Sequence, residues 1–124
     1  MSTYVGIAAE VVNEVTRSIA KHGEQRHLPM GTGPSTRPLR TRPTIADLNP
    51  YLPADGLAYR ATLDTKAHSQ NEGGDGTITW WHILREEVFE AAAEDDTAKL
   101  RAELVQVAAV ALKMIDAIDH GGDR

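Results

Sequence analysis

The last third of the chain carries a run of glutamates at helical spacing. They stand at positions 86, 87, 90 and 94. In a helix that turns about 100° per residue, Glu90 lies about 40° and Glu87 about 100° away from Glu86. The carboxylates therefore share one arc of the helix, beside a separate apolar face. Because like charges at this spacing repel one another, the arc is either a solvated acidic face or a site for a hard cation.

A further carboxylate, Glu103, lies in the middle of the apolar stripe of the next expected helix. The apolar residues within about 60° of it on a helical projection are Leu100, Val107, Val110, Ala111, Met114 and Ile118. A buried carboxylate has to be paired, protonated or bound to a metal. Arg17 and Arg60 are candidate partners, but the glutamates of the preceding helix offer a shared cation instead. We favour the cation because it accounts for both the acidic arc and Glu103.

Helical periodicity, and no clear period-two pattern, predicts an all-α fold in one domain spanning 1–124. All six prolines fall between Pro29 and Pro53, which predicts a long proline-rich loop over 27–54. Caps predict where the helices begin and end, with Gly23 ending the first and Thr79 preceding the third. The predicted helices run from about Tyr4 to Lys21, from about Asp55 to His68, from Trp80 to about Glu94, and from Thr97, after the break at Asp95-Asp96, to Asp119 before Gly121 and Gly122.

Composition excludes several classes of function. The chain has 124 residues and no cysteine, so thiolate metal sites and disulfides are excluded. A formal net charge of −5 argues against a duplex nucleic-acid partner. No apolar run is long enough to span a bilayer and the N-terminus does not resemble a signal peptide, so we expect a soluble, cytoplasmic protein. His68 and His82 lack the spacing of a zinc pair, so no zinc site is expected.

Motifs in this chain resemble a known family. The pattern Glu86-Glu87-x-x-Glu90, followed after twelve residues by Glu103-x-x-Gln106, resembles the acidic signature of the MazG-like all-α nucleotide pyrophosphohydrolases. That signature reads Glu-Glu-x-x-Glu, a short spacer, then Glu-x-x-Asp. Three segments are also similar to actinobacterial and phage MazG-like proteins: Lys21-His-Gly-Glu-Gln25, Gly76-Thr-Ile-Thr-Trp80 and Glu103-Leu-Val-Gln-Val-Ala-Ala109. The resemblance covers the N-terminal end and the C-terminal half, and leaves the proline-rich loop unexplained.

The resemblance implies a helical bundle completed by assembly into a homodimer or homotetramer. It also implies Mg²⁺-dependent hydrolysis of a nucleoside triphosphate to a monophosphate and pyrophosphate, with Mn²⁺ as an alternative cofactor. The implied metal ligands are Glu87, Glu90, Glu103 and Gln106, and Glu86 and Glu87 would be the catalytic carboxylates, with Glu86 a ligand or an orienting base. The implied nucleotide contacts are Lys21, His22, Glu24 and Gln25, against the plainer reading of an ordinary helix end. Apart from the resemblance, Trp80 or Trp81 could stack on a base, because aromatic faces bind bases, against the plainer reading of a core tryptophan.

One departure from the family pattern bears on activity. Gln106 stands where the signature has aspartate, and a neutral amide removes one negative charge from the ligand set. The alternative is therefore a nucleotide-binding protein of the same fold with weak or absent catalysis. A third reading, from a different class, is a helical oligomerisation module whose acidic face binds nothing.

Overall fold

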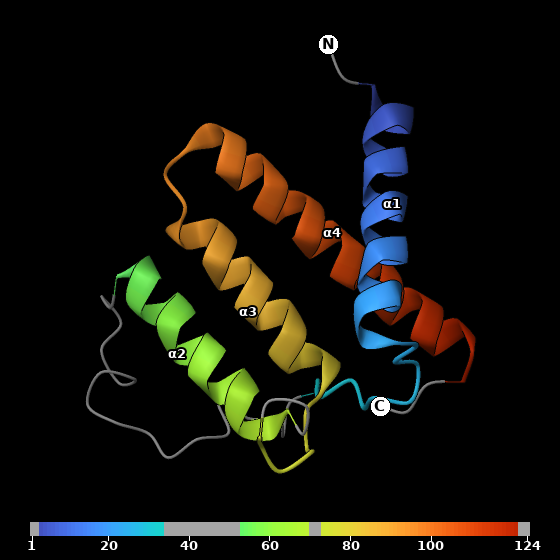
Figure 1. Cartoon of the computed structure of the whole chain (residues 1–124), viewed down its shortest axis with the longest axis vertical. Helices are drawn as coiled ribbons and strands as arrows, with labels where there is room; N and C mark the ends of the chain where they lie inside the picture. Colours follow the sequence, from blue (N-terminus) through green and yellow to red (C-terminus); the bar gives the residue numbers. More distant parts are fainter. Residues whose placement is uncertain (1–2, 34–52, 70–72, 122–124) are drawn as a thin grey trace.

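The computed structural model describes residues 3–33, 53–69 and 73–121 of the chain. Within these ranges it contains helices and no strand, which confirms the predicted all-α class. The helices are α1 (Tyr4–His22), α2 (Ala54–His68), α3 (Trp80–Ala93) and α4 (Thr97–Asp119) (Figure 1). Their ends agree with the predicted ones to within a residue. Most of the predicted loop over 27–54 lies outside the described residues.

Helices α2, α3 and α4 lie side by side, and α1 packs across α4 (Figure 1). The connection between α3 and α4 spans only residues 94–96, so the two helices run antiparallel. Asp96 caps α4 by accepting a hydrogen bond from the backbone N–H of Lys99 at 2.9 Å. This short connection places the last turns of α3 against the first turns of α4. Those turns carry Glu87, Glu90 and Glu103.

The start of α3 is fixed by its own cap and by the first residues of the proline-rich loop. The Thr79 hydroxyl accepts from the backbone N–H of His82, which caps the helix. Two further N–H groups of the first turn donate to the carbonyls of Pro29 and Met30. Gly31 has a φ of 73°, and a Cβ on it would collide with the Thr79 side chain. These contacts set the rotation of α3, and with it the direction of its glutamates.

The hydrophobic core lies at the end of the layer where α3 begins. It is formed by Leu28, Met30, Trp80, Val110 and Ala117. The Trp80 side chain is 1% exposed and packs between α3, α4 and the segment around Met30. This burial favours the core reading of Trp80, and its contact with a nucleotide stays a prediction. None of the described helices is both long and apolar enough to cross a membrane.

Candidate metal centre

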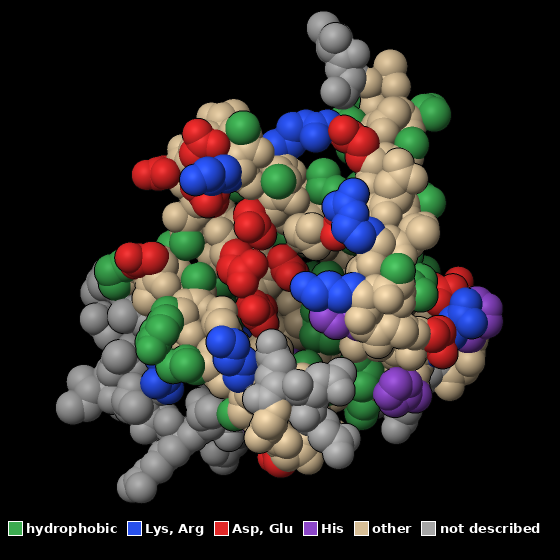
Figure 2. All heavy atoms as spheres, viewed as in Figure 1, with side chains coloured by type: hydrophobic (Ala, Val, Ile, Leu, Met, Phe, Trp, Pro, Cys, Tyr) green, Lys and Arg blue, Asp and Glu red, His purple; other side chains and the backbone are tan. Residues whose placement is uncertain are grey.

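Three glutamates from two helices converge on one point. Glu87 and Glu90 of α3 and Glu103 of α4 each offer a carboxylate oxygen, and these oxygens lie within 4.8 Å of one another. Glu86 adjoins them, close enough for its charge to act on both Glu87 and Glu90. All four residues are half-buried, and acidic side chains gather in the middle of the face drawn in Figure 2. The structure thus brings together the four glutamates singled out from the sequence.

The cluster holds its carboxyl groups in an environment that disfavours their charge. Burial, together with the negative charges of Glu103 and Glu86, raises the pKa of Glu87 to about 7. Burial raises the pKa of Glu90 to about 8, with Glu87, Glu86 and Glu103 acting in the same direction. At neutral pH these groups therefore retain protons unless a cation replaces them.

The donor set fits a hard divalent cation. Mg²⁺ prefers carboxylate oxygens at about 2.0–2.1 Å, so ligands on opposite sides of an octahedral ion stand about 4.2 Å apart. The carboxylate oxygens of Glu87, Glu90 and Glu103 lie within 4.8 Å of one another, so they can surround one ion after side-chain rotations that bring adjacent ligands to about 3 Å. Three carboxylates from protein leave the other coordination positions to water and phosphate oxygens, as is usual for Mg²⁺.

A fifth acidic residue, Glu14 of α1, belongs to the same electrostatic environment. Its side chain is buried, and its charge contributes to the raised pKa of Glu87. Arg17 pairs with Glu14 at 2.5 Å, so this arginine is committed to a glutamate other than Glu103. The sequence held a signal for Glu14, because this residue lies three positions after Val11 on the apolar stripe of the first helix. Glu103 has the same kind of position on the apolar stripe of the last helix.

Gln106, one turn beyond Glu103, lines a hollow of about 280 Å³ between α1 and α4. Glu14 lines the same hollow, so the amide and the buried carboxylate share one space. The carboxylate cluster is formed without Gln106, and its predicted role as a metal ligand stays a prediction. The hollow is lined by Glu10, Asn13, Glu14, Arg17, Arg101, Ala102, Val105 and Gln106.

The residues predicted to contact nucleotide after the first helix do not belong to the carboxylate cluster. Lys21, His22 and Glu24 are exposed and Gln25 is half-buried, at the C-terminal end of α1. The following residue, Arg26, pairs with Asp116 in the last turns of α4 at 2.8 Å. Asp116 lies thirteen residues beyond Glu103, about 20 Å along a helix.

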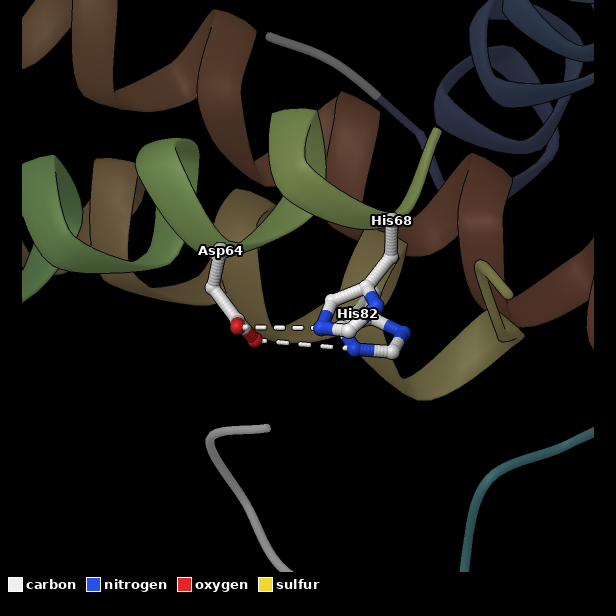
Figure 3. Close-up of side chains that lie close together, drawn as sticks. All are labelled: Asp64, His68 and His82. Carbon is white, nitrogen blue, oxygen red and sulfur yellow. Dashed lines mark ion pairs between the residues drawn. The ribbon is translucent and has the colours of Figure 1, made fainter. Parts of the chain in front are cut away.

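A second cluster of potential ligands lies between α2 and α3. The rings of His68 and His82 lie 4.7 Å apart, and both histidines approach the buried carboxylate of Asp64 (Figure 3). The Nε2 atoms of His68 and His82 are 3.4 and 3.5 Å from its two oxygens. The Arg85 guanidinium donates to the same carboxylate at 2.5 Å. Sequence reasoning considered His68 and His82 but missed Asp64 and Arg85, because α2 is only weakly amphipathic and the four residues span two helices.

Hydrogen bonds identify this second cluster as an ion-pair network and not a metal site. The backbone N–H of Thr79 donates to Nδ1 of His82 at 3.0 Å, so the ring proton of a neutral His82 is on Nε2. That proton points at Asp64, and a protonated nitrogen cannot ligate a metal. The Arg85 guanidinium on Asp64 adds a positive charge that would repel a cation. The network therefore joins α2 to α3.

No protein-family model, curated protein or solved structure matches the chain.

Proposed function

We propose that this protein is a Mg²⁺-dependent nucleotide pyrophosphohydrolase of the MazG-like type. The observation that carries the proposal is the convergence of Glu87, Glu90 and Glu103, from two helices, within 4.8 Å in a half-buried place. A cation accounts for that convergence, because its charge offsets both the burial and the mutual repulsion that raise the pKa values of Glu87 and Glu90. Nucleoside triphosphates are the ligand class that binds such a carboxylate-held Mg²⁺ through phosphate oxygens.

The residues of the cluster have distinct tasks in this proposal. Glu87, Glu90 and Glu103 hold the cation, which when bound neutralises phosphate oxygens and acidifies a bound water. Glu86 lies beside Glu90 at the edge of the cluster, where it can accept a proton from the attacking water. Glu14 keeps the local field negative from the α1 side, which favours cation binding.

The alternative is a nucleotide-binding protein that hydrolyses slowly or not at all. One observation favours it: Gln106 lines the hollow beside Glu14 as a neutral amide, where the family signature has a carboxylate. A ligand set with one charge fewer binds a divalent ion less tightly. Release of pyrophosphate distinguishes the enzyme from the binder.

The test is incubation of the purified protein with a panel of ribo- and deoxyribonucleoside triphosphates and Mg²⁺, with detection of monophosphate and pyrophosphate. We expect pyrophosphate from at least one nucleotide, and none when the metal is chelated. Glu103→Gln should abolish the activity, because it removes a ligand charge without changing shape. Glu94→Gln is the matched control on the same acidic arc, since Glu94 lies outside the cluster and accepts a backbone hydrogen bond from Asp96 that glutamine can retain. Equal activity of Glu103→Gln and wild type would refute the site.

A further inference from the structure

Lys113 of α4 is a half-buried cation held next to the carboxylate cluster. Its Nζ lies 2.5 Å from the hydroxyl oxygen of Ser18 on α1 and 5.6 Å from the centre of the Trp80 ring. The three residues come from α4, α1 and α3, so the ammonium group lies where these helices meet. A lysine stem tethered by a hydroxyl and an aromatic ring has less rotational freedom than a surface lysine.

The charges around Lys113 make its position unusual. Glu87 and Glu14 favour the charged ammonium, yet burial outweighs them and the pKa of Lys113 is lowered. In the described part of the chain, no salt bridge within 4.0 Å joins Lys113 to a carboxylate. The lysine is thus close enough to influence Glu87 while its ammonium group is bound to a neutral hydroxyl. A desolvated ammonium group without a direct anionic partner is suited to an anion supplied by a ligand.

We propose that Lys113 binds a phosphate oxygen of the ligand whose other phosphate oxygens are bound by the cation at Glu87, Glu90 and Glu103. The proposal rests on the proposed function and names the residue that recognises the phosphate chain. A di- or triphosphate carries more negative charge than one Mg²⁺ neutralises, so a second positive group next to the cation improves binding. Ser18 and Trp80 act as positioning residues, because they hold the ammonium group away from the carboxylates.

The competing explanation is that Lys113 only balances the charge of the glutamates. The two explanations differ in the size of one effect. Removal of the lysine charge should tighten Mg²⁺ binding in both cases, because a positive charge near the cation is lost. If Lys113 only balances charge, pyrophosphate binding at saturating Mg²⁺ will stay within about threefold of wild type, because only a screened charge at a distance is lost. If Lys113 binds phosphate, pyrophosphate binding will weaken by about tenfold or more, because a direct charged hydrogen bond is lost.

Titration calorimetry with Mg²⁺ alone, and with inorganic pyrophosphate at saturating Mg²⁺, measures both quantities. For Lys113→Met we expect Mg²⁺ affinity equal to or higher than wild type, and pyrophosphate affinity about 10- to 100-fold lower, the usual effect of losing a charged hydrogen bond. Lys113→Arg, which keeps the charge, should retain most of the pyrophosphate affinity. Lys99→Met is the matched control, because Lys99 is exposed on the same helix; it should change neither affinity.

Each outcome bears on a separate claim. If wild type binds Mg²⁺ and pyrophosphate but Lys113→Met binds pyrophosphate as well as wild type or better, the role of Lys113 is refuted and the proposed function stands. If wild type binds neither, both proposals fail. Should Lys113→Met not fold, as judged by circular dichroism, Lys113→Gln keeps a polar end group that can bond Ser18 and is subject to the same criterion.

Discussion

Arg85 of α3 and Asp64 of α2 form a fully buried ion pair, with Nη2 of the arginine 2.5 Å from Oδ2 of the aspartate. Arg85 directly precedes Glu86 and Glu87 in the sequence, and its side chain lies about 160° from that of Glu87 around the helix. The ion pair holds one side of α3 against α2, and Glu87, on the opposite side of α3, therefore points toward α4. This relationship connects the ion-pair network with the candidate metal centre.

Asp64→Asn should destabilise the protein strongly. The substitution leaves the buried guanidinium of Arg85 without its anionic partner, and breaking such a pair costs about 3–5 kcal/mol. Chemical denaturation followed by circular dichroism measures the free energy of unfolding. The double variant Asp64→Leu with Arg85→Met should recover much of the loss, since it removes both charges. A change below about 1 kcal/mol for Asp64→Asn would show that the pair is solvated in solution.

Magnesium affinity should rise with pH across the neutral range. The pKa of Glu87 is raised to about 7 and that of Glu90 to about 8, so protons compete with the cation below these values. We expect titrations between pH 6 and pH 9 to show tightening that levels off above about pH 8. Protons should be released on binding at pH 7, which calorimetry in buffers of different ionisation enthalpy detects. A pH-independent affinity would place the cation elsewhere.

The metal-free protein should lose stability over the same pH range. Both carboxyl groups have pKa values above the ordinary 4.5, so the folded state binds more protons than the unfolded state. Their contribution to stability is fully present below about pH 4.5 and is lost as pH rises through 7 and 8. Melting temperatures without metal should therefore fall from pH 6 to pH 9. Glu87→Gln should reduce this slope, and saturating Mg²⁺ should remove it.

Local signals in the sequence were sufficient to predict where the helices begin and end. Thr79 and Asp96 cap α3 and α4 through their own side chains, and Gly23 ends α1 with a φ of 77° that favours glycine. The convergence of Glu87 with Glu103 followed from periodicity and from the short connection between their helices. These features depend on residues close together in the chain, and a single sequence contains them.

Other features depend on contacts between distant residues. Asp64 and Arg85 lie 21 positions apart, and no local pattern pairs them. The core position of Trp80 depends on packing against Met30, which lies 50 positions earlier in the sequence, near the start of the proline-rich loop. The periodicity of one helix does not indicate which distant residue packs against it. Glu14 is the exception, because the argument that singled out Glu103 also applies to it.

The chain should form a homo-oligomer, most simply a dimer. Several large apolar side chains of α1 and α4 remain exposed in the single chain: Val12, Ile19, Leu104, Leu112, Ile115 and Ile118. Exposed apolar surface of this kind is typical of an interface. Light scattering at micromolar concentration should give at least twice the 13.5 kDa of one chain. Leu112→Glu on α4 should dissociate the oligomer, whereas Leu63→Glu on α2 should not. A monomeric wild type would contradict the prediction.

Gln106→Asp tests whether the missing carboxylate limits the site. The new charge would lie one turn from Glu103 and in the hollow that Glu14 lines, close to the carboxylates that hold the cation. We expect Mg²⁺ binding to tighten roughly tenfold, because affinity rises with ligand charge, and pyrophosphate release to increase. Glu90→Gln should act in the opposite direction, removing charge while preserving shape, and abolish most metal-dependent activity.

A different result would assign Gln106 to the nucleotide. Its amide can donate a hydrogen bond where aspartate cannot, so Gln106→Asp would then weaken nucleotide binding even at saturating Mg²⁺. Gln106→Asn is the control, because it has the length of aspartate without its charge. Calorimetry with Mg²⁺ and with a nucleotide on these variants and Glu90→Gln separates the two roles. If no variant changes either affinity, the glutamates of α3 and α4 are a solvated acidic face and the metal centre does not exist.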